Sequence, residues 1–209
     1  MSHEPERAYR CERATSAHAD GLLALFESAG SGCYCNYWYF EGDKNAWLER
    51  CYVKPEENRA ALVARLARPE LCGVVALAPH DQAVVGWLNL SRAPSVPRLY
   101  DQRVYRNLPC FRDGEAGNPA RENVFAVACC FVAEAERGRG VGRGLLNAAI
   151  CAARDAGASA LEAFPRAAPE GEQLRPDEVW LGPEGLFLAA GFSAVSDFRP
   201  YPVLRLHLR

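Results

Sequence analysis

The feature that most constrains this chain is a strand, a glycine-rich turn and a helix that follow one another over residues 124–156. Val124 to Ala133 is a continuous apolar run, too short to cross a membrane and typical of a buried strand. Residues 137–142 then hold three glycines and two arginines. Beyond them, apolar residues recur at the spacing of one helix face, which predicts an amphipathic helix. Such a turn directs free backbone N–H groups and a helix dipole toward an anion, so the segment predicts a phosphate site.

The spacing of the glycines limits which phosphate-containing ligands the turn could bind. Gly138, Gly140 and Gly142 alternate, whereas a dinucleotide fold uses G-x-G-x-x-G and a mononucleotide P-loop ends in Gly-Lys-Ser/Thr. The pattern that remains is Arg-x-x-Gly-x-Gly, beginning at Arg137. It resembles the pyrophosphate loop of the GNAT acyl-CoA N-acyltransferase superfamily. An ordinary glycine-rich turn between a strand and a helix is the alternative.

The resemblance implies how coenzyme A would bind. In that family, backbone amides of the turn hold the pyrophosphate, and glycine lets the phosphate approach the backbone closely. The two arginines of the turn would add positive charge, and pantetheine would lie where the central strand and the following strand diverge. The residues that we expect to bind the coenzyme are Phe131, Val132, Arg137, Gly138, Arg139, Gly140, Val141, Gly142 and Phe187.

Apolar periodicity and turn residues predict further elements along the whole chain. We expect strands near residues 9–14, 72–78, 83–90, 159–164, 193–199 and 203–208, and helices near 16–28, 43–50, 55–67 and 183–190. The proline-dotted connection from Ser91 to Arg121 is long for a structureless link, so it should hold a hidden helix or have a role of its own. The order is mixed α/β (α+β) and matches the resembling GNAT fold, in which a central mixed sheet of about seven strands is flanked by about four helices. We expect a single domain over residues 1–209.

Short motifs elsewhere agree with this resemblance. They are Cys33-x-Cys35-x-x-Trp38, Gly86-Trp87, the run from Leu161 to Pro165, and Gly191-Phe192. Together they resemble a poorly characterised bacterial branch of the superfamily. That branch implies a fold and an acyl donor but no acceptor.

Composition excludes several classes of protein. The net charge of −2 does not favour binding to nucleic acid or to a membrane surface. The N-terminus has no apolar segment, and no run approaches a membrane helix, so a cytoplasmic protein is expected. Nine cysteines and four histidines form no metal pattern, so no metal site is expected and a reducing compartment fits. A homodimer is compatible with the resemblance, because dimers are common in that family.

Acyl transfer also needs a group that removes a proton from the acceptor amine. Many enzymes of the resembling family place a glutamate on the central strand, but the positions near Ala126 and Ala128 offer no titratable group except cysteine. Glu162 is the candidate base, because a carboxylate in an apolar strand has a raised pKa. Its alternative is a glutamate paired with an arginine or facing solvent, and Glu134 is an alternative base at the mouth of the loop. Cys130 is the second catalytic candidate, although apolar burial makes a thiol inert as a nucleophile.

At the position of the group that protonates the leaving thiolate, this chain departs from the pattern of the resembling family. Many GNAT enzymes have a tyrosine where this chain has Phe187, and phenylalanine cannot donate a proton. Cys130, Tyr34 and Tyr37 are candidates to replace it. Otherwise the thiolate leaves unassisted, or the protein binds acyl-CoA without turning it over.

The acceptor side is predicted from the aromatic segment Ser31 to Phe40, which covers the acceptor cleft in the resembling family. Aromatic walls with hydroxyl groups suit a small polar amine, and a packed lid over the core is the alternative. The candidate acceptor-binding residues are Tyr34, Tyr37, Trp38, Trp87 and Arg92. Of these, Arg92 would suit an acceptor carboxylate.

The sequence therefore predicts an N-acetyltransferase that moves an acetyl group from acetyl-CoA to the amine of a small molecule in a direct ternary complex. A domain of the same fold that binds acyl-CoA without catalysis is the alternative. A nucleotide-phosphate binder without acyl chemistry is the third interpretation, and it predicts equal protection by ATP and by coenzyme A.

Overall fold

The computed structural model describes residues 9–115, 117–169 and 171–208. Within them, seven strands form one sheet in the order β1-β2-β3-β4-β5-β7-β6, and all neighbours are antiparallel except β4 and β5. The predicted mixed sheet of seven strands is confirmed. The strands are β1 (Arg10–Arg13), β2 (Gly73–Leu77), β3 (Val84–Arg92), β4 (Val124–Val132), β5 (Ala160–Ala163), β6 (Ser193–Ser196) and β7 (Val203–His207).

Six α-helices are found among the described residues, whereas about four were predicted. One of the additional helices is the short α4, which lies inside the connection from Ser91 to Arg121 and confirms that this link holds a hidden helix. The helices are α1 (Ala19–Ser28), α2 (Lys44–Tyr52), α3 (Pro55–Leu66), α4 (Pro97–Tyr100), α5 (Val141–Asp155) and α6 (Glu184–Ala189).

One face of the sheet is covered by α5 and α6. Because side chains alternate along a strand, Leu88 and Leu90 of β3 point to this face together with Phe125 and Val127 of β4. They pack against the apolar stripe of α5, which includes Leu145. This packing confirms the amphipathic helix that the sequence predicts after the glycine turn.

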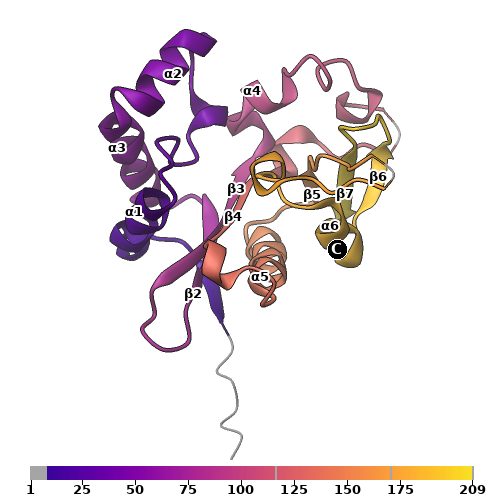
Figure 1. Cartoon of the computed structure of the whole chain (residues 1–209). Coiled ribbons are helices and arrows are strands. Elements are labelled where there is room, and N and C mark those ends of the chain that lie inside the picture. Colours follow the sequence, from indigo (N-terminus) through magenta and orange to yellow (C-terminus); the bar gives the residue numbers. More distant parts are fainter. Residues whose placement is uncertain (1–8, 116, 170, 209) are drawn as a thin grey trace, which may run out of the picture.

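The opposite face is covered in two parts. Helices α1 and α3 cover the half made by β2 and β3, where Trp87 is fully buried. The segment around Trp38, together with α4, covers β4 and β5 through Ala126 and Ala128. Figure 1 shows α1 to α3 on one side of the molecule and β5 to β7 on the other, with β3 and β4 between them. Within the described residues, no helix has the length and apolar character that a membrane crossing requires.

Candidate active site

The two central strands separate part-way along their length. Parallel pairing between β4 and β5 is confined to four residue pairs, from Val124–Ala160 to Val127–Ala163. Strand β5 then ends before Phe164 and Pro165, and proline has no N–H to continue the ladder. Among the described residues, the last five residues of β4 therefore have β3 on one edge and no strand on the other. We call this opening the β4–β5 split.

Alternate residues of β4 direct their backbone groups into the split. The Ala128 carbonyl oxygen accepts a hydrogen bond from Trp38 Nε1 at 2.8 Å, and the Cys130 N–H donates to the Trp180 carbonyl oxygen at 2.8 Å. The Val132 carbonyl oxygen accepts from Arg137 Nε at 3.2 Å. Phe131 lies between these residues and pairs with β3, so its backbone faces β3 and only its ring is left for another contact.

The glycine turn leads from the end of β4 into α5. Gly138 and Gly140 have φ values of +76° and +84°, a left-handed conformation that favours glycine. The backbone N–H groups of Gly138, Gly140, Val141 and Gly142 donate no hydrogen bond to another described residue. A Cβ at Gly138 would meet no atom within 4 Å, so the turn is open on that side. These free amides and the start of α5 could hold an anion, because helix N-termini attract negative charge.

The arginines of the turn have different environments. Both side chains are exposed. Arg137 donates from Nε to the Val132 carbonyl oxygen, which ties the turn to the end of β4. Arg139 lies 3.4 Å from the Glu136 carboxylate, and Glu136 also accepts a hydrogen bond from the Tyr9 hydroxyl. The turn therefore has charged side chains at its rim and bare amides at its centre.

Cys130 and Phe187 come together at the split. A Cβ added to Gly182 would lie 2.8 Å from Cζ of Phe187 and 3.5 Å from Cβ of Cys130, so Gly182 brings α6 close to β4. The Phe187 ring is fully buried and packs against Phe192 with ring centroids 5.4 Å apart. No proton donor stands at this position, and Phe187 would offer a coenzyme only an apolar surface.

Burial of the Cys130 thiol raises its pKa to about 12, with a smaller contribution from Cys35. Because a raised thiol pKa favours the neutral form, about one molecule in ten thousand holds the thiolate at pH 8. We expect iodoacetamide to alkylate the exposed Cys151 in the folded protein at pH 8 and to leave Cys130 unmodified. Peptide mass spectrometry after timed quenching measures both sites, and urea-unfolded protein is the control in which both react. Labelling of native Cys130 as fast as Cys151 would contradict the neutral thiol.

Glu162 belongs to strand β5, and its side chain forms a buried ion pair. Its side chain has no exposed surface, and one oxygen accepts from Arg205 at 2.7 and 3.0 Å and from Arg121 at 2.9 Å. The other oxygen accepts from Arg121 at 3.0 Å and from the Tyr100 hydroxyl at 2.8 Å. These contacts agree with the alternative given in the sequence analysis, in which Glu162 pairs with an arginine. The role of base stays a prediction for this residue.

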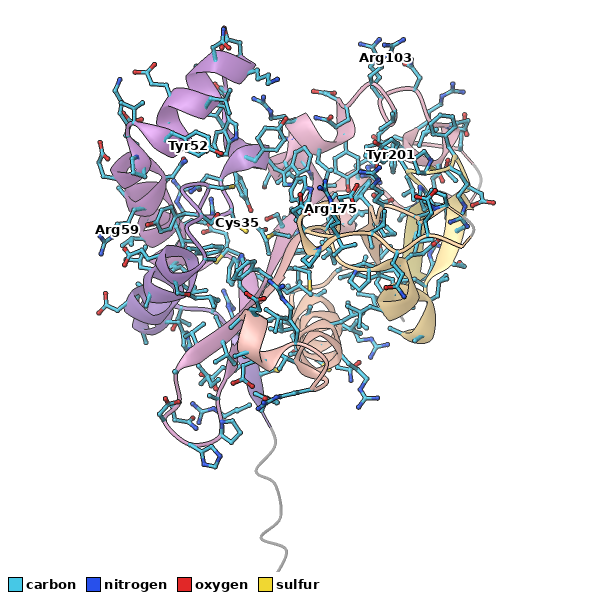
Figure 2. All side chains as sticks on the ribbon, viewed as in Figure 1. Cys35, Tyr52, Arg59, Arg103, Arg175 and Tyr201 are labelled. Carbon is cyan, nitrogen blue, oxygen red and sulfur yellow. The ribbon has the colours of Figure 1, made fainter. Side chains whose placement is uncertain are left out.

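The predicted aromatic segment lies against the split. Trp38 is buried and stacks on Trp180 with ring centroids 5.3 Å apart and an interplanar angle of 16°. Tyr37 packs edge-on against both tryptophans. Tyr34 is buried beside Phe26, and Tyr34 and Cys35 both have a left-handed backbone, with φ values of 44° and 54°. Figure 2 shows Cys35 at the middle of the molecule, beside the central strands.

Two predicted acceptor residues lie elsewhere. Trp87 is fully buried in the core under α1 and α3. Arg92 lies at the far end of β3, where it pairs with Phe125, while Gly86 at the other end pairs with Val132. Six residues of strand place Arg92 about 20 Å from the end of β4 that carries the glycine turn. The structure therefore brings together Tyr37, Trp38, Cys130 and Phe187 but separates Arg92 from them.

The family model of the acetyltransferase (GNAT) family matches residues 45–169. This range includes β2 to β5, the glycine turn and the whole of α5. The chain belongs to the GNAT acetyltransferase family. No curated protein sequence matches it significantly.

Solved structures agree with the GNAT fold at low sequence identity. A GCN5-related N-acetyltransferase from Kribbella flavida has 18% identity and a TM-score of 0.52, and the match covers 96% of this chain and 98% of that one. The protein yncA from Salmonella typhimurium, with its cofactor acetyl-CoA, has 14% identity, a TM-score of 0.53 and coverages of 97% and 95%. The PaiA N-acetyltransferase from Thermoplasma acidophilum, in complex with coenzyme A, has 10% identity, a TM-score of 0.54 and coverages of 96% and 99%.

Sequence reasoning missed one residue of this GNAT site. Trp180 lies in the loop that follows β5, and its carbonyl oxygen and ring both contact the split. Its segment has no periodicity that would assign it to an element. A tryptophan within a polar, proline-containing loop is the signal that could have found it, because large aromatics in such loops usually pack on something.

Proposed function

We propose that this GNAT protein is an N-acetyltransferase that transfers an acetyl group from acetyl-CoA to the amine of a small molecule. The observation that carries the proposal is the row of free amides at the start of α5, directly beside the split in which β4 has no neighbouring strand. A diphosphate fits the amides, and an extended thioester arm fits an unpaired strand edge. These two features support a coenzyme A donor more than a mononucleotide, which has no such arm.

The chemistry follows from the groups in the split. The acceptor nitrogen attacks the thioester carbonyl carbon, the C–N bond forms, and the C–S bond breaks as coenzyme A leaves with the proton that the amine loses. In this proposal the Cys130 N–H, on the edge of β4 that faces the split, donates to the oxygen on which charge develops. The Trp180 carbonyl oxygen holds this N–H at 2.8 Å, so the loop of Trp180 must release it when the donor binds.

Few groups near the split are suited to transfer a proton. A base role for Glu162 requires exchange through the Tyr100 hydroxyl, which lies 2.8 Å from its carboxylate. The neutral Cys130 thiol is the candidate donor to the leaving sulfur, in place of the tyrosine that Phe187 replaces. Direct attack in a ternary complex is preferred over an acetyl-cysteine intermediate, because a thiol with a pKa of about 12 is a poor nucleophile at neutral pH.

Thermal unfolding with coenzyme A, acetyl-CoA, ATP and NAD, each at the same concentration, tests the donor site. A ligand at 100 times its dissociation constant stabilises by about 2.7 kcal/mol, which raises the melting temperature by several degrees for a chain of this size. We expect a shift with coenzyme A and acetyl-CoA only. An equal shift with ATP would support a nucleotide-phosphate binder, and the absence of any shift with the coenzymes would overturn the donor assignment.

A non-catalytic acyl-CoA-binding domain is the second candidate. The position of Phe187 and the hydrogen bond between Cys130 and Trp180 favour it, since both remove groups that acyl transfer uses. Acetyl-CoA consumption over a panel of small amines separates the two functions. Binding of acetyl-CoA without turnover of any amine would favour the second candidate.

A further inference from the structure

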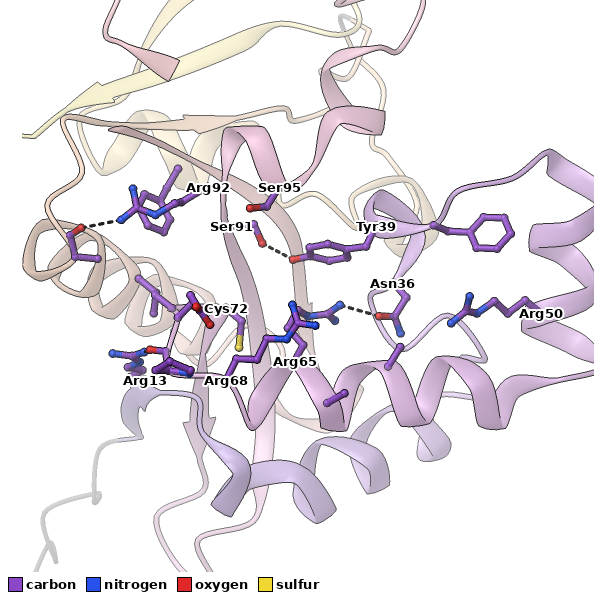
Figure 3. A pocket seen from close by; sticks show the side chains of 18 residues that line it. Arg13, Asn36, Tyr39, Arg50, Arg65, Arg68, Cys72, Ser91, Arg92 and Ser95 are labelled. Atoms are coloured by element: carbon purple, nitrogen blue, oxygen red, sulfur yellow. Dashed lines mark hydrogen bonds between the residues drawn. The ribbon is translucent and has the colours of Figure 1, made fainter. Parts of the chain in front are cut away.

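A cavity of about 620 Å³ lies at the end of the sheet opposite the glycine turn. It is enclosed by α3, by the segment around Tyr39 and by the last residues of β3, next to the start of β2. Five arginines line it, and Figure 3 shows Arg65 of α3 and Arg68, just beyond the end of α3, facing the same space as Tyr39 and Ser91. The five are Arg13, Arg50, Arg65, Arg68 and Arg92. We call this space the arginine cavity.

The charge of these arginines is poorly compensated. Among the described residues, Glu70 is the one acidic residue that lines the cavity, and Arg50 is the one lining arginine in an ion pair, at 3.8 Å from Glu57. Within the described ranges, the acceptors of Arg92 are the carbonyl oxygens of Glu122 and Ala156, at 2.8 and 3.4 Å. The whole chain has a net charge of −2, so this concentration of positive charge is a local feature.

The central guanidinium is held rigidly in place. Arg65 donates to Asn36 Oδ1 at 2.8 Å, and its guanidinium lies over the Tyr39 ring, 4.1 Å from the centroid. The Tyr39 hydroxyl in turn donates to Asn89 Oδ1 at 2.9 Å and is hydrogen bonded to Ser91. This frame fixes the group before any ligand arrives, which lowers the entropy cost of binding.

Some donors in the cavity have no acceptor. Arg65 Nε is buried without a hydrogen-bond partner among the described residues, whereas Arg50 Nε lies 3.8 Å from the Glu57 carboxylate. The Arg68 side chain, two residues beyond the C-terminal end of α3, makes no hydrogen bond or ion pair within the described part of the chain. The Arg68 guanidinium therefore has its donors available for the acceptor oxygens of a ligand in the cavity.

We propose that the arginine cavity binds a small anion that carries two or more carboxylate or phosphate groups. Guanidinium groups pair with the oxygens of either group in a bidentate manner, and the volume is that of a metabolite site. The site is independent of the acyl donor, because six residues of β3 separate Arg92 from the strand end beside the glycine turn. It therefore stands even if the proposed acetyl transfer fails.

Titration calorimetry with citrate and with inorganic pyrophosphate, at constant ionic strength, tests the site. The variant is Arg68→Gln, just beyond the C-terminal end of α3, and the matched control is Arg59→Gln, within α3. Arg59 is exposed and pairs with Glu27 at 3.3 Å, and Figure 2 shows it at the outer edge of the molecule. We expect binding to the unchanged protein, an affinity lower by at least about threefold in Arg68→Gln, and no change in Arg59→Gln.

Coenzyme A binding is measured on the same three proteins and is expected to be unchanged. Binding of citrate but not pyrophosphate would assign the site to carboxylates, and binding of pyrophosphate but not citrate would assign it to phosphates. Either result supports the proposal. Equal affinities in Arg68→Gln and Arg59→Gln would overturn it, because the anion would then bind elsewhere. Heats no larger than those of sodium chloride for both anions would also overturn it.

Discussion

Replacing Glu162 with glutamine should lower the free energy of unfolding by about 3–5 kcal/mol, because the change removes one partner of a buried charge pair. Arg205 is only 2% exposed and would keep its charge with no carboxylate to neutralise it. Arg121 and Tyr100 would lose the same acceptor. For a chain of this length the melting temperature should fall by on the order of 10 °C.

A matched control for this variant is Glu49→Gln. Glu49 pairs with Lys54 at 2.7 Å, the same distance as between Glu162 and Arg205. Unlike that buried pair, the Glu49 and Lys54 side chains are both about half exposed. Solvent screens such a pair, so little change is expected. Urea unfolding monitored by circular dichroism measures both variants. Equal stability of Glu162→Gln and the unchanged protein would contradict the structural role of the ion pair.

The Glu162→Gln variant also tests the predicted role of Glu162 as the general base. A structural role alone predicts that, well below the melting temperature, the folded Glu162→Gln protein keeps its kcat for acetyl transfer and its pH profile. A general base predicts a fall of about 10²–10⁴ in kcat and the loss of the acidic limb of the profile. Tyr100→Phe tests whether the proton reaches Glu162 through the Tyr100 hydroxyl, since this variant removes only the hydroxyl that donates to Glu162. A lower kcat would indicate such a relay, and an unchanged kcat would indicate direct proton exchange with Glu162.

The order of elements could be predicted because it depends on local patterns. The apolar run of β4, the glycines and the stripe of α5 are contiguous in sequence, and their structure follows from period and turn chemistry. Even the short α4 was signalled by the length of its connection. No residue range was predicted for α4, because its four residues are too few to show an apolar periodicity.

The contacts of the site could not be predicted in the same way, because they join distant segments. Glu162 meets Arg205 since β5 and β7 are neighbours with these residues in register, and Arg121 reaches it from before β4. Sequence alone places a charge in an apolar strand and leaves its partner open. The arginine cavity has the same origin, because its five arginines come from β1, α2, α3 and its C-terminal end, and β3.

Placing aspartate at Gly140 should abolish coenzyme A binding. The residue is the last before α5 and has φ of +84°, and an added Cβ would meet only Arg143, at 3.8 Å. The side chain therefore has room, and its carboxylate would stand among the amides proposed to hold the diphosphate. Two like charges about 4 Å apart near a protein surface repel by about 4 kcal/mol. A loss of affinity greater than a hundredfold is expected.

Asparagine at the same position is the matched control. Asparagine and aspartate both tolerate a left-handed backbone, have nearly the same shape and differ in charge. Gly140→Asn should therefore have the thermal stability of Gly140→Asp and should bind coenzyme A far more tightly. Titration calorimetry on both variants measures the difference. Similar affinities in the two would mean that the diphosphate does not bind at the start of α5, and the donor site would have to be sought elsewhere in the split.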